Sequence, residues 1–144
     1  MEYRKFDDTY YLRLDIGDEV ISSITQVCEN ENITLAGVQG IGGCKNAVTG
    51  VYNLESKSYS EERIEALLEI VSLIGNITEV EGKPFLHAHA VFAYKDDNGI
   101  TKTLAGHLLS AVIGLTGEII ITPQSGSIGR KVNDELGIKT WDFN

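Results

Sequence analysis

All three histidines of the chain lie close together in the sequence, as His87, His89 and His107. Side chains two residues apart on an extended strand project to the same face, so His87 and His89 could bind one metal ion together. Three neutral imidazoles with a fourth position open match catalytic zinc better than structural zinc, whose sites four protein ligands usually close. The spacing therefore predicts a three-histidine site for a divalent metal. Hydrogen-bonded or surface histidines on a strand are the alternative that it leaves open.

The turn between the two histidine segments decides whether His107 can join the other two. Residues 84–94 have the β-branched and aromatic composition of a strand, and the acidic Asn-Gly sequence at 96–99 is a strong turn signal. If Gly99 is left-handed after a type I turn, a three-residue loop pairs His89 with His107, with Cβ atoms about 5 Å apart. A two-residue loop would shift the register by one and turn His107 to the other face. The site hypothesis thus requires a loop of three or five residues.

Glu118 is the acidic residue that we select as a catalytic candidate, because it begins a β-prone run soon after His107. It could act as an acid or base, or orient a metal ligand; a solvent-facing carboxylate at a strand end is the alternative. Gly106, directly before His107, would allow the backbone to approach a neighbour closely. The glycines at 40–43 spell no phosphate-binding loop, and the segment around Ser125 lacks the motif of a nucleophilic serine.

Length and composition indicate one ordinary globular domain spanning residues 1–144. Cys28 and Cys44 are too few and too far apart for a disulfide framework, which suits a reducing interior. No apolar stretch approaches the roughly 20 residues of a membrane helix, and the N-terminus lacks the core of a signal peptide. We therefore expect a cytoplasmic protein without a membrane partner. A formal charge of −9 gives it no long-range attraction to polyanions.

Hydrophobic periodicity predicts an α+β domain dominated by antiparallel sheet, with one amphipathic helix over residues 18–30. The runs at 33–39 and 46–54 are interpreted as two strands around a glycine corner, and 60–80 fits a helix or, in its second half, a strand. The tail at 134–141 is interpreted as a turn or short strand. The remaining predicted strands are 10–16, the histidine hairpin of 83–94 and 100–109, and 118–122.

Five stretches taken together resemble the PPC domain, also called DUF296, which occurs alone in bacteria and archaea and beside AT-hooks in plants. They are residues 12–19, 37–42, 68–77, 82–89 and 106–109. The resemblance spans nearly the whole chain. It implies an antiparallel sheet or partial barrel with a helix packed on it, assembly as a homotrimer, and strand throughout 68–77. It also implies a fold related to that of acetolactate decarboxylase.

The resemblance extends to the candidate site. The HxH and GGH motifs of the family are regarded as a metal site, and acetolactate decarboxylase holds zinc with histidines from a comparable strand pair. This implies zinc or another divalent transition metal at His87, His89 and His107. Thr116-Gly117-Glu118 matches the family's Thr-Ala-Glu, which supports Glu118 as a neighbour of the site.

The sequence departs from the family pattern at two places near the site. Ala105 replaces the first glycine of GGH, and Leu136 stands where a threonine hydroxyl is common. Arg13, Glu69 and Asn76 are further pocket candidates that could complete the site, from the same protomer or from a neighbouring one.

Three functions follow as expectations. The first is a trimeric metal-binding protein, with lyase or hydrolase chemistry on a small carbonyl compound as its enzymatic form. Members of the family are often labelled DNA-binding, which implies a regulatory protein that binds DNA or a DNA-bound partner. Nucleic-acid affinity comes mainly from Lys and Arg neutralising phosphates, so the −9 charge and the lack of an AT-hook oppose this expectation. The third is a sensor that binds a small-molecule ligand between subunits.

Overall fold

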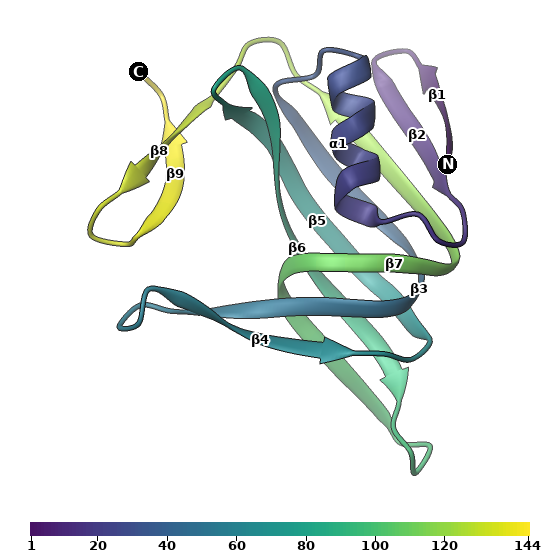
Figure 1. Ribbon diagram of the computed structural model, residues 1–144. Coiled ribbons are helices and arrows are strands. Elements are labelled where there is room, and N and C mark those ends of the chain that lie inside the picture. Colours follow the sequence, from purple (N-terminus) through teal and green to yellow (C-terminus); the bar gives the residue numbers. More distant parts are fainter.

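The computed structural model describes all residues, 1–144, as one helix and nine strands (Figure 1). The fold is α+β, as predicted, and most of it is sheet. In chain order the elements are β1 (Glu2–Phe6), β2 (Thr9–Leu14), α1 (Val20–Asn30), β3 (Ala36–Asn53), β4 (Ser58–Ile64), β5 (Leu68–Val80), β6 (Lys83–Lys95), β7 (Thr101–Pro123), β8 (Gly129–Asn133) and β9 (Ile138–Asp142).

The strands form one sheet in the order β1-β2-β7-β3-β5-β8-β9, with β4 on β3 and β6 between β5 and β7. All pairs are antiparallel except the short contact of β5 with β8. The first half of β7 pairs with β6 and its second half pairs with β2, while β3 lies beside both halves. The long strands bend strongly to do so (Figure 1). The sheet therefore curls into a partial barrel.

Helix α1 covers one face of the sheet and forms the core with it (Figure 1). Its apolar positions recur at helical spacing, so one side of the helix is buried. The buried residues of α1 are Val20, Ser23, Ile24, Val27 and Cys28. The carboxylate of Glu19 caps the helix by accepting from the Ser22 N–H at 2.7 Å, and its other oxygen accepts from the Ala111 N–H of β7 at 3.3 Å. The cap thus fixes the start of the helix against the sheet.

The opposite face of the sheet is uncovered, and we call it the open face. A continuous row of paired residues crosses it from β2 to the second half of β7, then through β3, β5 and β6 to the first half of β7. The row is Tyr11, Ile120, Gln39, Ile74, His89 and His107. Paired residues share a face, so the histidines lie on the open face. Ala88 and Ala90, which alternate with them, are buried on the other face.

Two predictions of strand extent were wrong. The two strands expected around a glycine corner are one strand, β3, whose register shifts between Gly40 and Gly42 and again before Asn46. Such bulges bend a strand without ending its pairing. The runs at 100–109 and 118–122 likewise belong to the single strand β7. The turn or short strand expected in the tail is confirmed, because a turn at 134–137 leads into β9, which pairs with β8. The strand implied over 68–77 is confirmed as part of β5.

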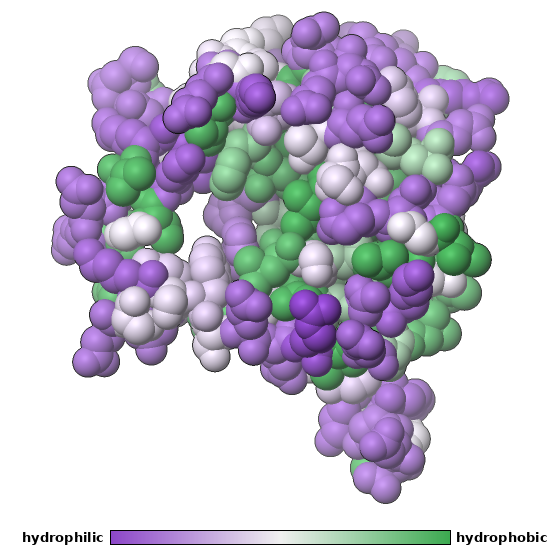
Figure 2. All heavy atoms as spheres, viewed as in Figure 1, coloured by the Kyte–Doolittle hydropathy of each residue, from purple (hydrophilic) through white to green (hydrophobic).

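Figure 2 shows the side of the molecule that carries α1. Hydrophilic side chains cover the helix and the turn that projects beyond β6 and β7, while apolar side chains gather between them. No helix is long and apolar enough to cross a membrane.

Candidate metal centre

The β6–β7 turn has the geometry that the site requires. The Asp96 N–H donates to the Ile100 carbonyl at 2.9 Å, which closes a three-residue loop, and Gly99 has a φ of 73°. The Asp96 carboxylate also accepts from the Ile100 N–H at 2.8 Å. The register that follows pairs His89 with His107, as predicted.

The three histidines converge on the open face. Their ligand nitrogens all lie within 4.8 Å of one another, and the ring centroids are 5.1 to 5.4 Å apart. A tetrahedral zinc ion with Zn–N bonds of about 2.0–2.1 Å needs its nitrogens about 3.4 Å apart. The three nitrogens, at most 4.8 Å apart, would have to approach one another by up to about 1.4 Å to reach that separation. The geometry therefore fits one divalent ion.

One atom of the cluster lacks a partner within the protein. The Nδ1 atom of His107 is buried and has no hydrogen-bond partner, the one side-chain nitrogen or oxygen in the protein in that state. Buried polar atoms are nearly always partnered, because an unpaired one costs about 1–3 kcal/mol. A metal ion that accepts this lone pair would remove the cost.

Electrostatics keep two of the imidazoles in the form that binds metal. Burial, with smaller contributions from His87 and His89, lowers the pKa of His107 to about 4. Burial also lowers the pKa of His87, and the positive charge of Arg130 and the neighbouring His89 act in the same direction. Both rings are therefore neutral at pH 7, with lone pairs free for coordination.

Aromatic and glycine residues of the neighbouring strands shape the back of the site. The Tyr59 ring of β4 stacks on His107 with 4.8 Å between centroids. At Gly106 an added Cβ would lie 2.7 Å from the Gly50 carbonyl oxygen, which confirms the expected close backbone approach. Sequence reasoning missed Tyr59, because nothing in the polar segment around it signals a site.

Asn76, like Gly106, is a pocket candidate that lies near the histidines, because it is the cross-strand partner of His87 in the pairing of β5 with β6. Its side-chain oxygen accepts from Arg130 at 3.0 Å. Arg130 comes from β8, at the far end of the sheet order, so its place beside the histidines could not be predicted from local sequence. Leu136 also lies in this C-terminal hairpin, where its carbonyl accepts from the Tyr52 hydroxyl at 2.6 Å.

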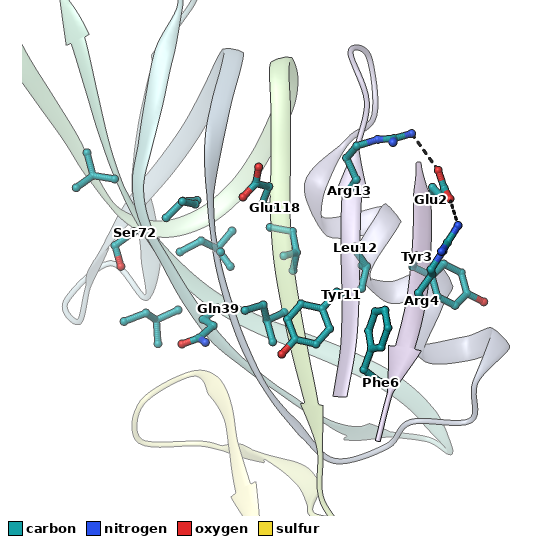
Figure 3. A pocket seen from close by; sticks show the side chains of 17 residues that line it. Glu2, Tyr3, Arg4, Phe6, Tyr11, Leu12, Arg13, Gln39, Ser72 and Glu118 are labelled. Carbon is teal, nitrogen blue, oxygen red and sulfur yellow. Dashed lines mark hydrogen bonds and ion pairs between the residues drawn. The ribbon is translucent and has the colours of Figure 1, made fainter. Parts of the chain in front are cut away.

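The other predicted residues lie apart from the histidine cluster. Glu118 and Arg13 pair with each other and line a hollow of about 800 Å³ on the open face (Figure 3). Arg13 contacts Glu2 and Asp15 there. Three strand spacings, about 14 Å along the sheet, separate Glu118 on β7 from the histidines of β6. Glu69 pairs with Gly43 and Ala93 and is not part of the histidine cluster.

Comparisons with known proteins agree with this architecture. Residues 1–124 match the Plants and Prokaryotes Conserved (PCC) domain. A crystal structure from Bacteroides thetaiotaomicron, named a "putative dna binding protein", is 27% identical, with a TM-score of 0.90 over 99% of this chain and 96% of the other. A protein of Archaeoglobus fulgidus named as metal-containing is 33% identical, with a TM-score of 0.84 over 97% of this chain and 94% of the other.

A more distant similarity concerns the fold alone. A Staphylococcus aureus protein described as similar to α-acetolactate decarboxylase is 17% identical, with a TM-score of 0.55 over 87% of this chain and 54% of the other. The expected relation to that fold is thus confirmed. The search of curated proteins found no match.

Proposed function

Since this chain belongs to the Plants and Prokaryotes Conserved (PCC) domain family, we propose that it is a metal-binding member whose His87, His89 and His107 hold one divalent transition ion, foremost zinc. The observation that carries the proposal is the convergence of three histidine ligand nitrogens within 4.8 Å of one another, with one of these histidines, His107, having a buried and unpartnered Nδ1. The metal-containing relative from Archaeoglobus fulgidus supports it.

The donor set favours chemistry over a purely structural role, because three neutral nitrogens leave a coordination position free. When bound, the ion supplies Lewis-acid polarisation of a carbonyl or water oxygen. His87 and His107 would hold the ion from adjacent strands, and the Tyr59 ring, which stacks on His107, covers one side of that imidazole. We therefore propose lyase or hydrolase activity on a small carbonyl compound as the enzymatic form of the function.

Metal analysis of the purified protein tests the proposal. We expect about one zinc or similar ion per chain, and none in a His87→Ala/His89→Ala variant whose circular dichroism is unchanged. Lys95→Ala/Lys102→Ala is the matched control, because both lysines lie on the same two strands and away from the cluster. A histidine variant that stays fully loaded would refute the proposal.

We also propose that the protein is a homotrimer that assembles through the open face. Large apolar side chains are exposed there without a covering element: Ile41 is 55% exposed, Val71 56% and Ile74 66%. Glu118 lies in the hollow among them. The carboxylate of Glu118 is far from the histidines of its own protomer, so a role in proton transfer would require a histidine site on a neighbouring subunit.

Association with DNA is the second candidate function, and the name of the Bacteroides thetaiotaomicron structure supports it. Titration of an AT-rich duplex at about 0.15 M salt tests it, with an Arg130→Glu/Lys131→Glu variant as the comparison. Binding that falls in this variant would support the candidate. Absence of binding by the unaltered protein would exclude it for this domain, in keeping with the charge of −9.

A further inference from the structure

Arg130 differs from the other arginines of the chain in having no acidic partner. Arg4, Arg13 and Arg63 each lie within 4.0 Å of a carboxylate oxygen. No carboxylate lies within that distance of Arg130, although the chain has 21 acidic residues and only 12 basic ones. A half-buried guanidinium without a counter-charge is costly, so this one needs a reason.

Neutral groups hold the Arg130 side chain in one position. Its Nε donates to the Thr78 hydroxyl at 2.6 Å, one terminal nitrogen donates to Asn76 at 3.0 Å, and the other to the Lys139 carbonyl at 3.2 Å. The guanidinium also lies over the Phe85 ring, 4.9 Å from its centroid. These contacts orient the group without neutralising its charge.

The guanidinium keeps free donors for a ligand. A guanidinium has five N–H groups, and three of them are used by the contacts above, so one N–H remains on each terminal nitrogen. Two parallel N–H groups match the two oxygens of a planar carboxylate. Arg130 therefore keeps two N–H donors that an anion such as a carboxylate can accept.

The position of Arg130 connects this anion to the histidines. Asn76, which accepts from Arg130, is the cross-strand partner of His87 and shares its face. The cluster itself contains histidines alone and no acidic side chain. A divalent ion held there beside Arg130 would produce a site with excess positive charge, because the same protomer places no carboxylate in the cluster or within 4.0 Å of Arg130.

We propose that Arg130 binds the carboxylate of a small 2-oxo or 2-hydroxy acid, whose second oxygen faces the three histidines. This inference rests on the proposed metal site and gives the class of its substrate or ligand. Arg130 is a binding residue that fixes the orientation of the acid and selects for the carboxylate.

Calorimetric titration of the zinc-loaded protein with pyruvate and lactate tests the inference, with acetate and inorganic phosphate as comparison ligands. We expect pyruvate or lactate to bind more tightly than acetate, which lacks the second oxygen donor. Arg130→Gln should weaken binding at least tenfold with the metal content unchanged, and Arg130→Lys should restore little because it lacks the planar fork. Arg63→Gln, in an exposed ion pair, should bind like the unaltered protein.

The same titrations contain the outcomes that overturn the inference. Equal affinity of Arg130→Gln and the unaltered protein, or no binding of either acid at about 10 mM, would refute it. Tighter binding of phosphate than of both acids would refute the carboxylate class. Cobalt-substituted protein adds a spectroscopic readout, because a bound acid must change the visible absorption of the ion. If the unaltered protein takes up no metal, the proposed function fails. The inference about Arg130 is then tested on the metal-free protein: binding of the acids that Arg130→Gln abolishes would support it, and its absence would refute it.

Discussion

At the scale of single residues, the site depends on imidazoles that stay neutral. The hairpin buries His107 between His87, His89 and Tyr59, where a charged ring would lose its hydration and meet two further imidazoles. The same burial leaves Nδ1 of His107 without a partner. The residue thus destabilises the metal-free protein slightly and favours an ion that can accept its lone pair.

This arrangement predicts a pH-dependent stability of the metal-free protein. An unfolded histidine titrates near pH 6.5, whereas the pKa of folded His107 is about 4. Between these values the unfolded state takes up a proton that the folded state does not, so the free energy of unfolding falls as the pH falls. His107→Asn should reduce this fall by about 1–2 kcal/mol, after allowance for partial solvent screening. Urea denaturation from about pH 7 to pH 4.5 measures it, and identical slopes for both proteins would contradict the prediction.

The backbone at Gly106 gives a second residue-scale prediction. A Cβ there would lie 2.7 Å from the Gly50 carbonyl oxygen, and β3 and β7 would have to separate. Gly106→Ala should therefore lower the free energy of unfolding by about 2 kcal/mol and reduce metal binding. Gly37→Ala is the control, because a Cβ at that position meets nothing within 4 Å. Equal loss of stability in the two variants would show that the close approach is unimportant.

At the scale of elements, the sequence predicted what local chemistry controls. Turn residues before Ile100 fixed the hairpin register, and with it the pairing of His89 and His107. The extent of β3 and β7 was not predictable in this way. Glycines within these strands look like strand ends in the sequence, and only the pairing with distant strands shows that the strands continue through bulges there. Arg130 escaped prediction for the same reason: β8 reaches β5 across 50 residues of chain.

The contact between the β3–β4 hairpin and the β8–β9 hairpin leads to an element-scale prediction. The Tyr52 hydroxyl donates to the Leu136 carbonyl at 2.6 Å, and Lys57 donates to the Asp134 carbonyl at 2.7 Å. Tyr52→Phe should cost about 1 kcal/mol locally, so amides of 129–142 should exchange several-fold faster. Tyr11→Phe is the control, because Tyr11 lies on β2 and is 48% exposed. Unchanged exchange in Tyr52→Phe would show that other contacts hold the C-terminal hairpin.

At the scale of the whole molecule, the two faces of the sheet differ in what covers them. One face is buried under α1, whereas the open face exposes isoleucine and valine side chains beside the histidines. A contiguous apolar surface of this kind is characteristic of a protein interface. Because Ile74 is both the partner of His89 and part of the hollow, assembly and the metal site adjoin each other.

The proposed homotrimer should therefore depend on Ile74. Its side chain is 66% exposed in the protomer, so Ile74→Asp should change the stability of an isolated chain by no more than about 0.5 kcal/mol. In an assembly the same substitution would bury an unpaired charge, which costs several kcal/mol at each contact. We expect sedimentation to show trimers for the unaltered protein and monomers for Ile74→Asp. Leu54→Asp, at a similarly exposed position (59%) beyond the hollow, should remain trimeric. Trimers that persist in Ile74→Asp would place the subunit contacts on another surface, and Glu118 would then have no route to a neighbouring histidine site.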